Sequence, residues 1–137
     1  MSRSIACIDY RDGKIFIAKR AQKGDMGGKW EFPGGKIEDG EDFETAIKRE
    51  MLEEFGVDVK VHEKITEGTF FHKGKKCSLF VFFTEFSEDG IKKPFVLTEH
   101  TEYKWVEPEE INKLDFVDSD LSIFPEVLKS IKNEKAD

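Results

Sequence analysis

The sequence predicts an α+β fold, a layered sandwich with one central helix and one C-terminal helix. Short segments rich in β-branched and aromatic residues indicate strands, and two longer segments repeat apolar residues with helical spacing. Strands combined with two amphipathic helices bury their apolar faces most simply as stacked layers. A length of 137 residues fits one domain over residues 1–137.

The N-terminal third predicts short strands. Ile5–Tyr10 and Lys14–Arg20 are expected to be strands joined by the turn Arg11–Gly13, with glycine where a positive φ is needed. Trp30–Phe32 predicts another short strand, which Pro33–Gly35 should end.

One helix is expected over Asp42–Phe55. Asp42 suits the N-cap, and Gly56 suits the left-handed residue that ends a helix. The apolar stripe is expected to comprise Phe43, Ala46, Ile47, Met51 and Leu52.

The second half predicts longer strands and the final helix. Val57–Phe71 and Cys77–Phe86 are expected to be strands around a basic loop, His72–Lys76. The remaining expected elements are a strand at Glu102–Val106 (with Thr101 as an alternative start), a helical turn at Pro108–Lys113, and a helix at Ser119–Lys132 with Leu121, Phe124, Leu128 and Ile131 on one face.

Composition excludes several classes of function. The net charge of −7 argues against nucleic acid as the main partner, since proteins that bind it usually carry basic patches. Cys7 and Cys77 lie in apolar segments without metal-type spacing, which predicts free thiols in a reducing cytoplasm. The longest apolar run, Leu79–Phe83, is far too short to cross a membrane. We therefore expect a cytoplasmic monomer or homodimer.

Three glutamates are the strongest indication of chemistry. Glu50, Glu53 and Glu54 share one face of the predicted helix, near its C-terminus. Mutual repulsion and the helix dipole both disfavour this cluster, so a bound cation would explain it. Mg²⁺ or Mn²⁺ suits carboxylates and usually takes further ligands from substrate phosphates. The alternative is a solvated acidic face with no ligand.

The neighbouring residues favour the metal site. Pro33-Gly34-Gly35 lets backbone approach the helix closely and offers carbonyl ligands. Arg49 is expected to pair with Glu41 and so fix the preceding loop against the helix.

This stretch resembles the Nudix family. The pattern Gly-x5-Glu-x7-Arg-Glu-U-x-Glu-Glu-x-Gly-U, with U apolar, is the Nudix box, and it is complete from Gly35 to Val57. The segments Ile15–Arg20 and Trp30–Glu38 further resemble the MutT branch, the diphosphatases that clean nucleotide pools. The resemblance implies a Nudix-type α/β/α sandwich with a mixed sheet, and a Mg²⁺-dependent pyrophosphohydrolase.

The resemblance also implies roles for individual residues. Metal binding and water activation would fall to Glu50, Glu53, Glu54 and Glu99, with the Gly34 carbonyl as a further metal ligand. Substrate contacts are expected from Arg20, Glu31, Phe32, Pro33, Gly34, Lys36, Asp118 and Asp120. Water would attack the β-phosphorus of a nucleoside triphosphate, giving monophosphate and pyrophosphate, with Glu50, Glu53 or Glu99 taking the proton.

Two departures from the MutT branch concern the base. Asp120 stands where that branch has an asparagine that recognises oxidised guanine, and Asp25 stands where it has a histidine. An ionised aspartate only accepts hydrogen bonds, which favours an amino-bearing edge such as that of cytosine. Burial that raised the pKa of Asp120 would let it donate as well, and would restore 8-oxo-dGTP as a candidate beside (d)CTP. The alternative role for Asp118 and Asp120 is capping of the final helix.

Other functions stay open at this stage. The substrate could be a nucleotide sugar, a dinucleoside polyphosphate or an RNA 5′ end, although only Lys73–Lys76 hints at a basic groove for RNA. A non-catalytic nucleotide sensor is the alternative from another class, and the complete box disfavours it.

Overall fold

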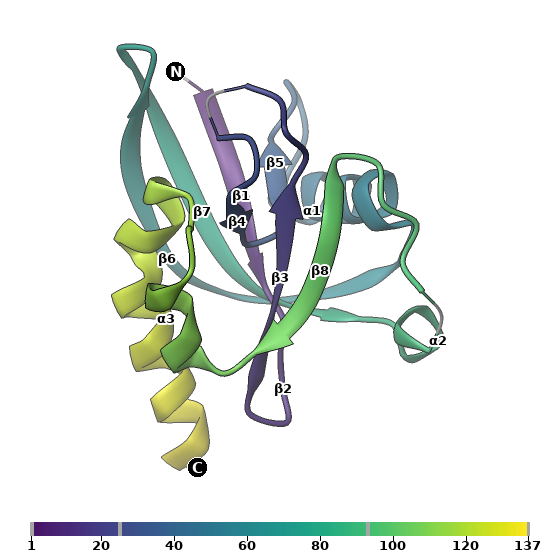
Figure 1. The fold of residues 1–137 in the computed structure, drawn as a ribbon. Helices are drawn as coiled ribbons and strands as arrows, with labels where there is room; N and C mark the ends of the chain where they lie inside the picture. Colours follow the sequence, from purple (N-terminus) through teal and green to yellow (C-terminus); the bar gives the residue numbers. More distant parts are fainter. Residues whose placement is uncertain (1, 25, 93, 137) are drawn as a thin grey trace.

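The computed structural model describes residues 2–24, 26–92 and 94–136 (Figure 1). Its elements, in chain order, are β1 (Ser2–Ile8), β2 (Tyr10–Arg11), β3 (Lys14–Arg20), β4 (Trp30–Glu31), β5 (Gly34–Lys36), α1 (Phe43–Phe55), β6 (Val59–His72), β7 (Lys75–Phe86), α2 (Glu88–Ile91), β8 (His100–Val106), the 3-10 helix η1 (Pro108–Lys113) and α3 (Asp118–Ala136).

The strands form two sheets. One has the order β5-β1-β7-β6, in which β1 and β7 run parallel and the other neighbours run antiparallel. The other has the order β2-β3-β4, with β8 also paired to β3, and is antiparallel. The predicted mixed sheet is therefore confirmed.

The two helices cover different apolar clusters. Alternation along the strands sends Ile5 and Cys7 of β1 towards α1, and Ala6 and Ile8 towards α3. The α1 side is rich in aromatic rings, with Phe16 at its centre in edge-on contact with Phe55, Phe86, Phe95 and Trp105. This arrangement is the predicted α/β/α sandwich.

The first predicted strand is wrong in its extent. Ile5–Tyr10 is divided at Asp9, so that β1 and β2 belong to different sheets. The Asp9 carboxylate is buried and accepts hydrogen bonds from the Arg11 guanidinium, at 3.0 Å to each oxygen, and from the Phe86 N–H at 2.8 Å. The buried Asp9 carboxylate thereby joins the two sheets. Hydrophobic periodicity does not indicate that the predicted strand divides at this residue.

The turns follow local backbone chemistry. Asp12 and Gly13 both have positive φ between β2 and β3, as expected for a tight hairpin. The predicted five-residue loop His72–Lys76 is wrong, because Lys73 and Gly74, with φ of 52° and 78°, alone form the turn. The hairpin of β6 and β7 is consequently longer than predicted and projects beyond the sheet (Figure 1).

Other differences concern element boundaries. Pro33–Gly35 was predicted to end a strand, and β4 does end before it, but Gly34 and Gly35 then form β5 with Lys36 against β1. The four-residue helix α2 was not predicted. Leu52 is 58% exposed and does not belong to the buried stripe of α1. Cys7 and Cys77 are free and buried, as predicted. Among the described residues, no helix combines the length and apolar character that a membrane span requires.

Candidate active site

A cavity of about 670 Å³ brings together most of the predicted site residues. Its walls include Glu50, Glu53 and Glu54 from α1, and Asp120 from α3. The cavity is also lined by Arg20, Glu31, Phe32, Gly34, Gly35, Lys36 and Glu99. Residues far apart in the sequence thus converge because both helices pack on the same strands.

The ends of α1 place its glutamates against β5. The Asp42 carboxylate accepts the Thr45 N–H at 2.8 Å, and Gly56 ends the helix with φ 67°. At Gly35, a Cβ atom would lie 2.5 Å from the Glu50 carboxyl carbon, so any larger residue would force the Glu50 carboxylate to shift. The Glu50 carboxylate therefore sits directly beside the backbone of β5.

Burial makes the carboxylate cluster electrostatically costly. Burial, followed by the charges of Glu50, Glu31 and Glu99, raises the pKa of Glu54 to about 9. The pKa of Glu50 is also raised, chiefly by burial. One Glu54 oxygen is buried and has no hydrogen-bond partner among the described residues. A buried oxygen of this kind is suited to a cation or to a proton.

Arg49 holds the loop before α1 against the glutamates. Its guanidinium donates to both Glu41 oxygens, at 2.7 and 2.8 Å, to Glu50 at 2.9 Å, and to the Lys36 carbonyl at 3.0 Å. The predicted Arg49–Glu41 pair is present, and Arg49 positions Glu50 as well.

Glu31 and the buried His100 hold Arg20 in place at the cavity. Its guanidinium donates to Glu31 at 3.1 Å, and the other Glu31 oxygen lies 2.8 Å from Nε2 of His100. The His100 ring is almost fully buried and stacks on Phe55. Sequence reasoning missed His100, although its position next to Glu99 could have drawn attention to it.

Asp120 is buried in the wall of the cavity. One of its carboxyl oxygens accepts the Phe32 N–H at 2.9 Å. Burial, followed by the charge of Glu31, raises the pKa of Asp120 to about 8. Because this carboxylate bonds to the backbone of Phe32, between β4 and β5, Asp120 joins α3 to the cavity wall.

Some predicted residues lie elsewhere. Asp118 begins α3, is exposed and does not line the cavity. Pro33 is buried, and its carbonyl accepts the Cys7 N–H within the sheet. Glu99 does line the cavity, because Thr98 bonds to the Glu53 carbonyl at 2.9 Å and ties the loop to the end of α1. Asp25 lies outside the described residues.

The donor atoms fit a hard divalent cation that shares its coordination with substrate. Among the residues described, no three His, Cys, Asp or Glu side chains form a complete ligand set by themselves. Carboxylate oxygens and nearby backbone carbonyls with open positions suit Mg²⁺, which commonly keeps water and phosphate ligands. The unpartnered oxygen of Glu54 is the observation that supports such a cation here.

Comparison with known proteins agrees with the fold and the glutamate pattern. Residues 2–127 match the model of the NUDIX domain. A CTP pyrophosphohydrolase of Escherichia coli K12 is 29% identical over 123 residues, which cover 90% of this chain and 88% of the relative. An 8-oxo-dGTP diphosphatase of Proteus vulgaris is 55% identical over 49 residues, or 36% of this chain and 44% of the relative.

A solved structure extends the similarity to the whole chain. The solution structure of the E. coli ORF135 protein superposes with a TM-score of 0.84 at 29% identity, covering 100% of this chain and 95% of that one. The fold and the carboxylate cavity together define a hydrolase. The chain belongs to the Nudix family and is a MutT-like Nudix hydrolase.

Proposed function

We propose that this enzyme is a Mg²⁺-dependent pyrophosphohydrolase that converts (deoxy)nucleoside triphosphates to monophosphates and pyrophosphate. The observation that carries the proposal is that one cavity is lined both by the carboxylates beside Gly35 and by the buried Asp120. The carboxylates suit a metal-bound phosphate chain, and Asp120 suits the edge of a base. The free, buried thiols fit a cytoplasmic enzyme.

The residues divide the chemistry between them. Glu50, Glu54 and the Gly34 carbonyl would hold Mg²⁺, which when bound supplies charge neutralisation at the phosphates and a more acidic water. Glu53 and Glu99 are exposed in the cavity, so either can accept the proton of the attacking water. Arg20, held by Glu31, and Lys36 provide positive charge for the phosphates.

We propose cytosine as the preferred base. Asp120 accepts hydrogen bonds when ionised, and a cytosine amino group donates one. The similarity to the E. coli CTP pyrophosphohydrolase supports this choice. The raised pKa of Asp120 favours 8-oxoguanine as a second candidate, because a protonated carboxyl can also donate.

The test is a hydrolysis screen with canonical, methylated and oxidised nucleoside triphosphates and Mg²⁺. Pyrophosphate and orthophosphate are measured separately. We expect pyrophosphate as the primary product, with CTP, dCTP or 8-oxo-dGTP among the best substrates. Orthophosphate as the primary product, or hydrolysis confined to nucleotide sugars or dinucleoside polyphosphates, would reject the proposal.

A further inference from the structure

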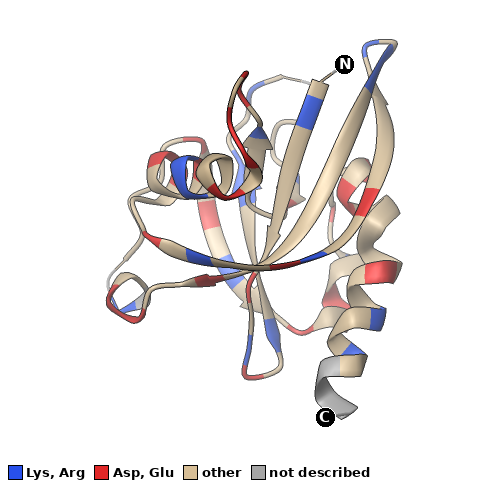
Figure 2. Cartoon of the chain, turned by 180° about the vertical axis from the view of Figure 1, so that it is seen from behind, with Lys and Arg blue, Asp and Glu red and all other residues tan. Residues whose placement is uncertain are grey.

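A second cavity, of about 640 Å³, lies at the end of the sheet beside the hairpin of β6 and β7. Four cationic side chains line it, namely Arg3, Lys36, Lys75 and Lys76, against one acid, Asp39. Figure 2 shows Lys and Arg on the hairpin tip and near the start of β1, at the same end of the molecule. This basic cavity is notable because the chain as a whole carries a net charge of −7.

The pairing of strands produces the cluster. The start of β1 lies beside the start of β7, with Ser2 opposite Cys77, and Ser4 lies opposite Lys36 of β5. Three separate segments thus contribute cations to one place. Among the described residues, no carboxylate lies within ion-pair distance of these four side chains, whereas Arg20 and Arg49 are both paired. Their charge is therefore available to an anion.

The basic cavity continues the active site along β5. Asp120 bonds to Phe32 just before this strand, Glu50 contacts Gly35 within it, and Lys36 follows at its end. Lys36 lines both cavities, and the adjacent residues Ser4 and Arg3 line one each. From Phe32 to Lys36 the chain thus passes Asp120, then the Glu50 carboxylate, then the basic cavity.

We propose that the basic cavity is a second phosphate subsite. It takes the part of a substrate's phosphate chain that extends past the carboxylates, so longer chains gain binding there. Its ligand class is a linear polyphosphate, either free or attached to a nucleoside. The assignment rests on the proposed function, which places the scissile phosphates at Glu50 and Glu54.

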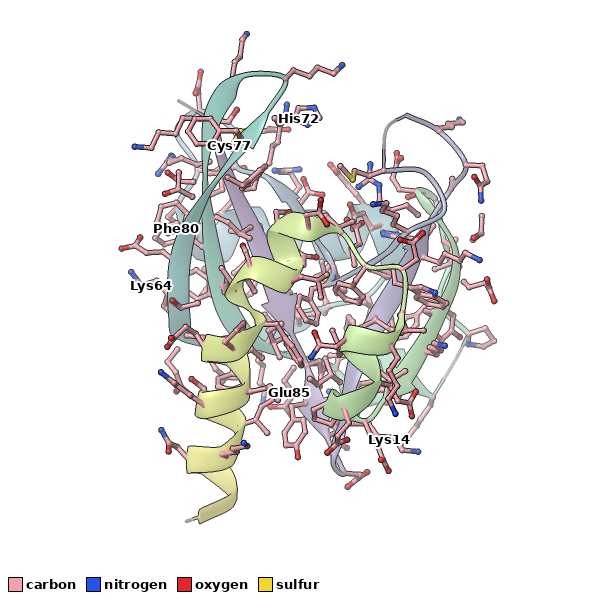
Figure 3. The ribbon with its side chains drawn as sticks, turned by 60° about the vertical axis from the view of Figure 1, so that its left-hand side comes forward. Lys14, Lys64, His72, Cys77, Phe80 and Glu85 are labelled. Carbon is pink, nitrogen blue, oxygen red and sulfur yellow. The ribbon has the colours of Figure 1, made fainter. Side chains whose placement is uncertain are left out.

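The first test measures binding of inorganic tripolyphosphate by calorimetry in metal-free buffer. The Lys75→Gln/Lys76→Gln double variant removes two exposed cations. It should raise the dissociation constant for tripolyphosphate by about tenfold. The control is Lys14→Gln/Lys113→Gln, which changes net charge equally at exposed positions away from the cavity. Figure 3 shows Lys14 far from the hairpin residues His72 and Cys77. Equal weakening in both doubles, or none in the first, would overturn the subsite.

The second test compares nucleoside di-, tri- and tetraphosphates of one base as substrates. The Lys75→Gln/Lys76→Gln variant should lose about tenfold in kcat/KM for the tetraphosphate and little for the diphosphate. A loss independent of chain length would overturn the proposal. The proposal would also be overturned if a 5′-triphosphorylated RNA bound through the same lysines more tightly than tripolyphosphate does. That result would assign the cavity to RNA. If no nucleotide is hydrolysed, the proposed function fails, while the tripolyphosphate measurement still decides the subsite.

Discussion

Asp120 illustrates how burial changes what a single carboxyl group can recognise. Its place near the base is a prediction from the sequence, which left open whether the side chain is buried. The structure shows that one oxygen already accepts the Phe32 N–H and that burial raises the pKa to about 8. Asp118, two residues earlier, has the same side chain but is exposed and outside the cavity. Sequence spacing alone does not distinguish the two.

The first prediction concerns base selectivity. Asp120→Asn keeps an acceptor for the Phe32 N–H and changes the group offered to the base. Leaving a buried hydrogen-bonding group of the base without a partner costs about 1–3 kcal/mol, so relative kcat/KM among CTP, GTP and 8-oxo-dGTP should shift by about tenfold. Equal falls for all three substrates would mean that the base is recognised elsewhere.

The second prediction concerns the pH dependence of stability. An acid whose folded-state pKa is raised stabilises the fold below its unfolded pKa, and this contribution is lost as pH rises through the folded value. For Asp120 the window runs from about pH 4 to about pH 8. Asp120→Asn should therefore flatten the fall in unfolding free energy across this window, by at most about 1.4 kcal/mol per pH unit. Denaturant unfolding in metal-free buffer measures it, and an unchanged pH profile would contradict the assignment.

At the scale of elements, α1 and β5 form the site together. The sequence predicted α1 closely, because its cap residues and apolar spacing are local features. It did not predict β5, since Gly34–Lys36 forms a strand only through pairing with β1. Leu52 was misplaced for a related reason, because the boundary of a buried helix face depends on what packs against it. Tertiary contacts, rather than local propensity, decide these cases.

The third prediction concerns the loop that Arg49 holds. The hydrogen bonds from the Arg49 guanidinium lower the pKa of Glu41 to about 2. Glu41→Gln removes the negative charge that pairs with this guanidinium. Since Arg49 also bonds to Glu50, the Mg²⁺ concentration for half-maximal activity should rise about tenfold. Saturating Mg²⁺ should restore most of the turnover. Glu44→Gln, on the exposed face of the same helix, is the control. Unchanged Mg²⁺ dependence in Glu41→Gln would show that Arg49 does not position Glu50.

At the scale of the whole molecule, charge is distributed unevenly. A net charge of −7 led to the expectation that nucleic acid is not the partner, which stays a prediction. The sum conceals both the acidic end of the active site and the basic cavity next to it. Pairing of β1 with β5 and β7 brings these two regions together. The separate sequence segments do not indicate that the two regions are neighbours. Composition therefore indicates the class of ligand less well than the local arrangement of charge.

In the proposed reaction, the glutamates of α1 hold the metal that activates the attacking water. The most direct test is steady-state hydrolysis of CTP by Glu54→Gln across a Mg²⁺ titration, with pyrophosphate as the readout and Glu44→Gln as the control. Glu54→Gln keeps the size of the side chain and removes the charge, so kcat should fall about 100-fold or more while the protein stays folded. In metal-free buffer at a pH above about 9, where Glu54 is ionised, the thermal midpoint of the variant should equal or exceed that of the unmodified enzyme, because a like-charge repulsion with Glu50 is removed. Turnover close to that of the unmodified enzyme at the same Mg²⁺ concentrations would contradict the claim.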